Sequence, residues 1–450
     1  MNASTLALLA LGSLVVGLVY LGFFSTRVVM LALRSGGRRD DAADADDPLA
    51  DSRFAVPATV LIPLRHLGNS AVETVTCALA SVYPEFEVIV VADGSGQEQV
   101  DRLKERWQLE PREVFYRQAL ATGAVERIYR SAADSRLLVV QKAPGGFADA
   151  LNCGLNLAQY RYVIVVDAAM RFGADALMRA AAPALRDPDR VAAVGTHVER
   201  LRAVSGRRGR RWSDRFQRLG SIRALMDTRI GSHAAAVPGE RDLVVVWRRD
   251  SVVQQGGFSS TAANPVADMM TRLSRPAPAA GIEGDPANGT PATDAAAPAS
   301  AIDASRVVWQ GDVVGTIEPL GFDEARRAAA VAQPWRPESS GESEGRVARL
   351  LQRGDAAVRA AVGLVLLGLV LALAAGAATW IDILAVVGAL SFGQAAMTAA
   401  ALLVRGAVPR APRGYELLRL IAASPFELVL YRMPLAIARL SVSAPVSRRS

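Results

Sequence analysis

Residues 86–95 read FEVIVVADGS, and the fold prediction starts from this segment. The run FEVIVVA is almost continuously apolar and rich in β-branched residues, which is typical of a strand buried on both faces of a parallel sheet. The Asp93-Gly94-Ser95 segment that follows is typical of a turn. Ligands bind at the carboxyl ends of strands in open parallel sheets, so Asp93 is the first candidate functional residue.

The same pattern continues on either side of this strand. We expect further strands at Ala58–Leu64, Leu137–Gln141 and Tyr162–Asp167, and helices at Ala71–Val82 and Ala148–Ala158. Alternating strands and helices predict an α/β fold with a doubly wound sheet. We place this domain at residues 58–340, with a strand pattern returning at Ser305–Pro319. Within it, residues 276–300 are rich in Ala, Pro and Gly and lack periodicity, which predicts a disordered insertion.

The composition indicates that strongly apolar segments are joined to an ordinary charged domain. The chain has 450 residues, 21% of them charged, and a net charge of +7, yet its mean hydropathy is positive at +0.21. Three runs carry no charge, and each is long enough to span a bilayer core of about 30 Å at about 1.5 Å per residue. These runs are Thr5–Thr26, Ala360–Ile381 and Ile383–Val404. We therefore predict an N-terminal transmembrane anchor at 1–34, a linker at 35–57 and a transmembrane helical hairpin at 357–404.

The first run has an alternative interpretation as a signal peptide. A signal peptide begins with a basic region and ends at a small-residue cleavage site. Arg27 is the first basic residue of the chain and follows the apolar run, and no cleavage site is evident. The anchor is therefore the favoured interpretation.

Arginines flank the predicted spans and orient them. They follow the first and third spans and precede the second, so the positive-inside rule places the middle domain and the C-terminus in the cytoplasm, with the protein in the plasma membrane. Residues 415–440 are apolar but interrupted by charges, which predicts interfacial amphipathic helices; a fourth span is the lesser alternative.

Two cysteines and three histidines exclude a disulfide scaffold and argue against Cys- or His-rich metal sites.

A series of segments resembles a known family when taken in order. The segments are Val60–Pro63, Tyr83–Ser95, Lys142–Leu155, Tyr162–Ala169, Gly256–Ser259 and Ala267–Leu273. Their order and spacing resemble those of the membrane-bound, inverting family 2 glycosyltransferases of the GT-A fold. That group includes makers of extracellular polysaccharide and ceramide-glucosyltransferase-like enzymes. The resemblance implies transfer of a hexosyl or N-acetylhexosaminyl group from a nucleotide-diphosphate donor to a lipid or polysaccharide acceptor.

The resemblance also implies roles for individual residues. Asp268 matches the acid that deprotonates the acceptor hydroxyl, a general-base role; an exposed helix aspartate is the alternative. Asp93 would bind the base or ribose, or else be a plain turn residue. Lys142, beside Gly145-Gly146, would face phosphate, or else be a surface lysine. The full set of implied substrate-binding residues is Pro63, Asp93, Lys142, Gly146, Asn152, Asp167, Trp335 and Arg336, and Asn152 has packed polar structure as its alternative.

The chain departs from the family pattern at the expected metal site. The family places an Asp-x-Asp motif at the end of the strand that we expect at Tyr162–Asp167. The second acid of that motif would coordinate a divalent cation that bridges the diphosphate. Here Asp167 is followed two residues later by Ala169, so Asp167 alone is a poor magnesium or manganese site. The glutamine–arginine–tryptophan motif has only a reordered counterpart at 333–336. These departures motivate a second hypothesis, a catalytically inactive membrane scaffold or nucleotide-sugar sensor.

One basic stretch has two interpretations. Residues 200–223 contain nine arginines interleaved with Trp212 and Phe216. Binding of nucleic acid is one interpretation, and contact with anionic lipid headgroups is the other. Predicted membrane segments on both sides of the domain favour the lipid, so no nucleic-acid partner is expected.

Three predicted spans are few for a polymer channel, so export of a polymer would need a partner protein.

Overall fold

The computed structural model describes residues 56–64, 71–94, 97–200, 211–230, 243–262, 264–274, 306–317 and 414–432. It also describes isolated residues at 25 and 29, scattered residues between 373 and 402, and residues 434 and 435. The insertion and almost all of the linker and of the three predicted spans lie outside these residues. Within the described part, no helix has the length and apolarity needed to cross a membrane. The predictions for those segments therefore stay predictions.

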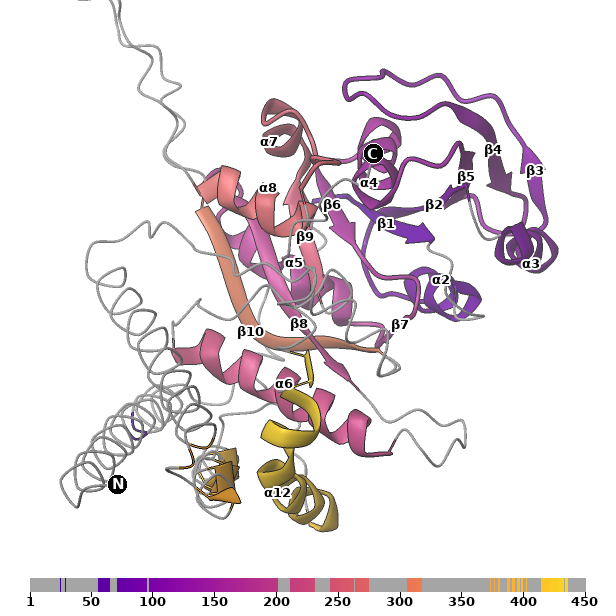
Figure 1. Ribbon diagram of the computed structural model, residues 1–450. Coiled ribbons are helices and arrows are strands. Elements are labelled where there is room, and N and C mark those ends of the chain that lie inside the picture. The colour runs from indigo at the N-terminus through magenta and orange to yellow at the C-terminus, as the bar shows by residue number, and fades with distance from the viewer. Residues whose placement is uncertain are drawn as a thin grey trace, which may run out of the picture.

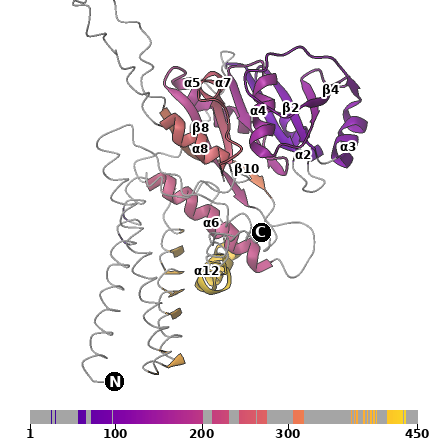
Figure 2. The same ribbon diagram turned by 45° about the horizontal axis from the view of Figure 1, so that its top comes forward.

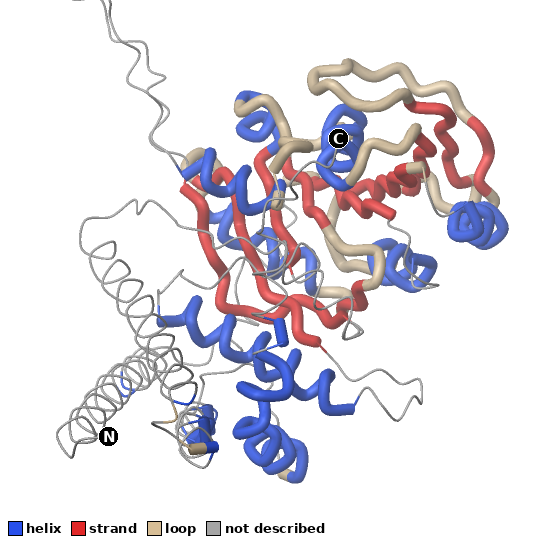
Figure 3. Tube along the Cα trace, in the orientation of Figure 1, coloured by secondary structure: helices blue, strands red, loops and turns tan. Residues whose placement is uncertain are grey.

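The domain is built on one ten-stranded mixed sheet in the order β3-β4-β5-β2-β1-β6-β9-β8-β10-β7 (Figures 1 and 3). The strands are β1 Ala58–Leu64, β2 Phe86–Asp93, β3 Leu109–Pro111, β4 Val125–Ser131, β5 Leu137–Lys142, β6 Tyr162–Val165, β7 Met170–Phe172, β8 Val191–Arg200, β9 Leu243–Arg248 and β10 Arg306–Ile317. The four neighbours β5, β2, β1 and β6 are parallel. These four strands match the expectation from the sequence.

Beyond the parallel centre the sheet is mixed, which corrects the expectation of a doubly wound sheet. β4 runs antiparallel to β5 at one side, and β9 runs antiparallel to both β6 and β8 at the other. Because β9 reverses between them, β8 points the same way as β6. The carboxyl ends of β2, β5, β6 and β8 therefore lie on the same edge of the sheet.

Helices cover both faces of the sheet. The helices are α2 Ala71–Leu79, α3 Gln97–Trp107, α4 Phe147–Leu157, α5 Ala176–Arg186, α6 Arg211–Ile230, α7 Arg249–Gln254, α8 Pro265–Ser274 and α12 Tyr415–Glu427, followed by the π-helical turn η3 Leu428–Arg432. One apolar core contains α2, α3 and α5, and the other contains α4, α7 and α8. Alternate residues of β1 enter opposite cores, Ile62 the first and Leu61 the second, as a pleated strand buried on both faces requires.

Close packing fixes α4 on the sheet. A Cβ atom at Gly154 would overlap the side chain of Leu61, so glycine lets the helix approach β1 closely. Residues along α4 are nearly all buried, and burial of apolar surface contributes roughly 25 cal/mol per Å². This packing holds the N-terminus of α4 at the carboxyl edge of the sheet.

The helices α6 and α12 lie together at one end of the domain. Figure 2 shows them lying against each other at one end of the domain, away from α2, α3 and α4. Helix α6 contacts β8 and β10 as well as α12. Helix α12 lies within the segment 415–440 that the sequence predicts to form interfacial amphipathic helices, and the position of that segment on a membrane stays a prediction.

Candidate functional site

The site begins at Asp93, the last residue of β2. Its carboxylate accepts hydrogen bonds from the backbone amides of Gly145 at 2.8 Å and Gly146 at 2.5 Å. Gly146 has φ 90° and immediately precedes α4, a backbone conformation that favours glycine. Asp93 therefore holds the turn from which α4 begins.

Lys142 completes this arrangement from β5. Asp93 and Lys142 occupy paired positions on adjacent parallel strands, and the Lys142 ammonium lies 2.6 Å from the Asp93 carboxylate. It also contacts the carboxylate of Asp149 and donates to the carbonyl of Ala143 at 2.5 Å. The lysine is only 1% exposed, so its ammonium is enclosed by these groups and is not a surface lysine.

The charges around Lys142 fix its protonation. Burial lowers the pKa of Lys142, but the hydrogen bonds to Asp149 and Asp93 together outweigh burial and raise that pKa above its usual value. Asp149 in turn accepts a hydrogen bond from the amide of Gly123 at 3.0 Å. The site therefore contains a permanent buried cation between two carboxylates, which ties β2, β5 and α4 together.

Asn152 connects α4 to a loop that is distant in sequence and contains Gly256 and Gly257, here called the glycine loop. Its side chain donates to the carbonyl of Phe258 at 2.9 Å and accepts from the amide of Phe258 at 2.8 Å. Gly257 packs directly against it, because a Cβ there would lie 2.7 Å from Asn152 Oδ1. The packed polar alternative considered for Asn152 describes this geometry.

Asp268 lies in the first turn of α8. Its carboxylate is 2.8 Å from Arg272 one turn later, and the Asp268 side chain is 33% exposed. Arg272 also donates to the carbonyls of Gln255 at 2.6 Å and Gly257 at 2.7 Å. Asp268 is thus accessible to a substrate and held by an arginine that also binds the glycine loop.

Asp167 follows β6, and its carboxylate accepts the amide of Ala169 at 2.8 Å. Ala169 therefore binds Asp167 with its backbone amide, at the position where the family pattern has a second carboxylate. No group of three His, Cys, Asp or Glu residues that could hold a metal ion occurs in the described ranges. The described residues do not fit a divalent cation at Asp167.

Pro63 marks the place where β1 and β6 separate. The carbonyl of Leu61 accepts the amide of Val166, so the backbone of Leu61, and of Pro63 two residues on, faces β6. The pairing with β6 ends at Leu61, and the missing N–H of Pro63 therefore breaks no ladder hydrogen bond. Parallel sheets bind ligands where neighbouring strands part in this way.

The structure thus groups the sequence-predicted residues into connected units. Asp93, Lys142 and Gly146 form one unit, and Asn152 links α4 to the loop that Arg272, the partner of Asp268, holds. Trp335 and Arg336 lie outside the described residues. Sequence reasoning missed Asp149 and Arg272, although the four-residue spacing of Asp268 and Arg272 is a recognisable helical pair.

The comparisons with known proteins agree with this fold. Residues 59–237 match the model of the family described as glycosyl transferase family 2. This range contains Asp93, Lys142, Asn152 and Asp167, whereas Asp268 lies beyond its end. No curated protein matches the chain.

Several solved structures are similar to this chain. A mannosyltransferase from Pyrobaculum calidifontis, solved in complex with GDP-Man and Mn²⁺, is 16% identical with a TM-score of 0.50, covering 94% of this chain and 99% of its own. TarS residues 1–349 from S. aureus are 13% identical with a TM-score of 0.36, covering 86% and 92%. The glucosyl-3-phosphoglycerate synthase from Mycobacterium tuberculosis is 14% identical with a TM-score of 0.32, covering 63% and 81%.

The likeness to the Pyrobaculum calidifontis enzyme shows a shared fold. Together with the family match it supports a family 2 glycosyltransferase domain of GT-A-like fold in this chain.

Proposed function

We propose that this chain transfers a sugar from a nucleotide-diphosphate donor to a lipid or polysaccharide acceptor, with inversion, at the cytoplasmic face of the plasma membrane. One observation carries the proposal. The turn held by Asp93 and the carboxylate of Asp268 are connected through α4, by way of Asn152, Phe258 and Arg272. A connected framework of this kind keeps a donor site and an acceptor base in fixed relation, as transfer requires.

In this proposal Asp268 accepts the proton of the acceptor hydroxyl as that oxygen attacks the anomeric carbon and the bond to the nucleoside diphosphate breaks. Arg272 keeps the carboxylate oriented, because its guanidinium is itself fixed by two backbone carbonyls. The donor lies at the carboxyl edge of the sheet, where β1 and β6 part beside Pro63. No step is assigned to a metal ion, because the described residues do not fit one.

The membrane part of the proposal comes from the three charge-free runs of the sequence. They tether the domain on both sides, so the acceptor is a molecule present at the membrane. Export of a polymer would then require a partner protein. The sugar and the acceptor are left open between hexosyl and N-acetylhexosaminyl donors and between lipid and glycan acceptors.

The first experiment measures turnover of a panel of nucleotide sugars by the purified full chain with membrane-lipid acceptors. Asp268→Asn should lower the rate about 100-fold or more, because the base is lost. Asp250→Asn is the matched control, since Asp250 is an exposed acid in the first turn of α7, and it should leave the rate unchanged. Absence of turnover with every donor, or equal rates for the two variants, would reject the proposal.

A second candidate function is a non-catalytic membrane scaffold or nucleotide-sugar sensor. The observation that favours it is the Asp167 carboxylate, which is bound by the amide of Ala169 where a second acid would stand. Calorimetry with UDP and GDP, with and without manganese, tests this second function, and the turnover experiment above separates it from catalysis. The scaffold predicts no manganese dependence, and manganese-strengthened binding in the micromolar range would contradict it.

A further inference from the structure

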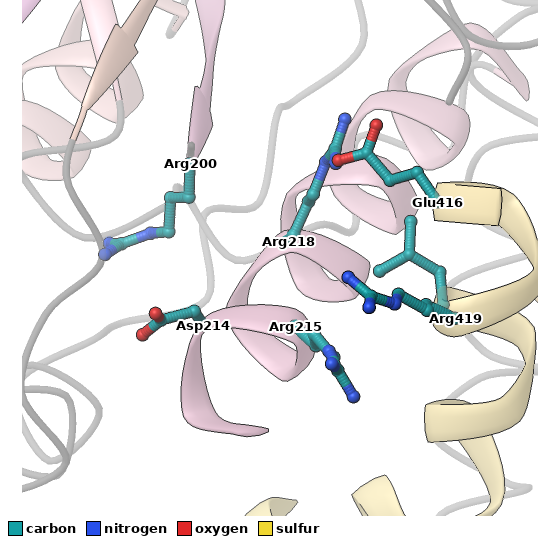
Figure 4. Close-up of a pocket in the computed structure, with 7 residues that line it drawn as sticks. Arg200, Asp214, Arg215, Arg218, Glu416 and Arg419 are labelled. Atoms are coloured by element: carbon teal, nitrogen blue, oxygen red, sulfur yellow. The ribbon is translucent and has the colours of Figure 1, made fainter. Parts of the chain in front are cut away.

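A pocket of about 120 Å³ lies between α6 and α12 (Figure 4). Four arginines and two acids line it: Arg200, Arg215, Arg218, Arg419, Asp214 and Glu416. Arg200 ends β8, so the pocket begins at the same edge of the sheet as Asp93 and Asp167. The lining carries more positive than negative charge, which favours an anionic ligand.

Two of the arginines build the wall of the pocket. Arg218 lies 2.8 Å from Glu199 and also contacts Glu416, and Figure 4 shows Arg218 and Glu416 pointing toward each other between the two helices. Arg200 is 7% exposed and donates to Gln217 at 2.9 Å. These contacts fix α12 to α6 and to the end of β8.

The other two arginines have no carboxylate partner among the described residues. The guanidinium of Arg215 lies over the ring of Trp212, 5.1 Å from its centroid. The guanidinium of Arg419 lies over the ring of Tyr415 at 3.9 Å and donates to the Tyr415 hydroxyl at 2.8 Å. Stacking on an aromatic ring orients a guanidinium and leaves donors for an anion, and planar guanidinium groups suit phosphate.

An exposed apolar stripe runs along α12 beside the pocket. Leu418 is 64% exposed and Phe426 is 52% exposed, and their spacing by eight residues places them on one face of the helix. The Trp212 ring of α6 lies 6.0 Å from that of Phe426 and is itself 48% exposed. Tryptophan and tyrosine beside arginine are typical of surfaces that lie in the headgroup region of a bilayer.

We propose that this pocket binds the phosphate headgroup of an anionic phospholipid while α12 lies on the bilayer surface. The proposal rests on the membrane anchoring included in the proposed function. The last charge-free run ends at Val404, and Tyr415 follows eleven residues later. Eleven residues reach at most about 40 Å, so α12 stays near the membrane face. The phosphate supplies the negative charge that Arg215 and Arg419 do not find among the described residues, and the apolar stripe supplies contact with acyl chains.

The lipid would orient the transferase domain on the membrane. Because Arg200 and α6 connect the pocket to β8, a lipid bound there would set the position of the sheet edge relative to the bilayer. The site therefore acts as a lipid-dependent positioning device and not as part of the sugar-transfer chemistry.

The test measures binding of brominated phosphatidylglycerol to the detergent-purified full chain by quenching of tryptophan fluorescence, without any nucleotide sugar. Brominated phosphatidylcholine is the neutral comparison, and Trp212→Phe assigns the quenching to the pocket. We expect Arg215→Gln with Arg419→Gln to weaken phosphatidylglycerol binding about 30-fold, from roughly fivefold for each arginine. Neither arginine has a carboxylate partner among the described residues, so the fold should persist, which thermal unfolding checks.

The control removes the same charge elsewhere. Arg102→Gln with Arg112→Gln neutralises two exposed arginines, on α3 and just after β3, and should leave binding unchanged. Equal weakening by this control, equal binding of the neutral lipid, unchanged quenching in Trp212→Phe, or RNA binding as tight as the lipid would each overturn the proposal. Because no donor is present, failure of this test is distinguishable from failure of the proposed transfer activity.

Discussion

The ammonium of Lys142 lies 2.6 Å from the carboxylate of Asp93, across the paired parallel strands β5 and β2. The same carboxylate holds the amides of Gly145 and Gly146. A salt bridge between neighbouring strands therefore shapes the turn that leads into α4. Since removing one partner of a buried ion pair leaves an uncompensated charge, this relationship makes a strong prediction about stability.

Lys142→Met should lower the free energy of unfolding by about 3–5 kcal/mol, because the carboxylates of Asp93 and Asp149 would remain buried without a cation. Urea unfolding of the purified full chain followed by circular dichroism measures the change. Lys104→Gln is the control, since Lys104 is a partly exposed lysine that pairs with Asp101 on α3 and lies over the ring of Tyr129, and the change should cost about 1 kcal/mol or less. Equal losses in the two variants would show that the Lys142 pair is not buried as described.

The stability of the protein should also respond to alkaline pH through Lys142. Its pKa is raised in the folded state, so its contribution is fully present below the usual lysine pKa of about 10.4. That contribution is lost as the pH rises through the higher folded pKa. Unfolding free energies measured from pH 8 to pH 12 should show this loss in Lys104→Gln, which removes the only other lysine of the sequence. Because the pKa of Lys104 is also raised in the folded state, Lys142→Met is compared within the Lys104→Gln background. The double variant should lack the Lys142 component, and an identical alkaline profile with and without Lys142→Met would contradict the prediction.

Gly256 and Gly257 offer a matched pair for testing the Asn152 contact. Both have positive φ, +79° and +78°, but a Cβ at Gly256 meets nothing within 4 Å. A Cβ at Gly257 would lie 2.7 Å from Asn152 Oδ1 and 2.9 Å from the Leu120 side chain. Gly256→Ala should cost about 1–2 kcal/mol for the left-handed backbone. Gly257→Ala should cost about 1–3 kcal/mol more, because overpacking is added. Thermal unfolding of both variants checks the order, and equal costs would argue against close packing at Asn152.

Arg272 is a positioning residue for Asp268 if the proposed transfer activity is correct. Arg272→Gln should lower kcat about 10- to 100-fold with little change in the donor KM, because the carboxylate loses its orientation. In the Asp268→Asn background the same change should have almost no effect, since both residues act as one unit. Arg179→Gln removes a comparable helical pair with Asp175 on α5 and should leave kcat unchanged. If the effects of Arg272→Gln and Asp268→Asn on kcat were fully additive, the two residues would not act as one unit and the prediction would be wrong.

The parallel centre of the sheet was predictable, because continuous apolar runs such as ATVLIPL are typical of strands buried on both faces. The strand pattern at Ser305–Pro319 corresponds to β10, but the antiparallel strands β4 and β9 were not predicted. In β4, Ile128 and Tyr129 are buried while Glu126 and Arg127 are exposed, so the strand shows neither a continuous apolar run nor regular alternation. The place of β9 in the sheet depends on its pairing with β6 and β8, which are distant from it in the chain. Local pattern contains no information on such pairing.

The amino-acid sequence alone was enough to predict the alternation of strands and helices, the position of Asp93 at a strand end and a helical segment from Tyr415. These features follow from hydrophobic period and turn residues, which are local properties. The binding partners of the polar residues depend instead on the tertiary structure. Lys142 and Asp93 are 49 positions apart, and Asn152 and Phe258 are 106 positions apart. Strand register and helix packing bring these groups within hydrogen-bond distance, so the same lysine that resembled a phosphate ligand became a buried ion-pair partner.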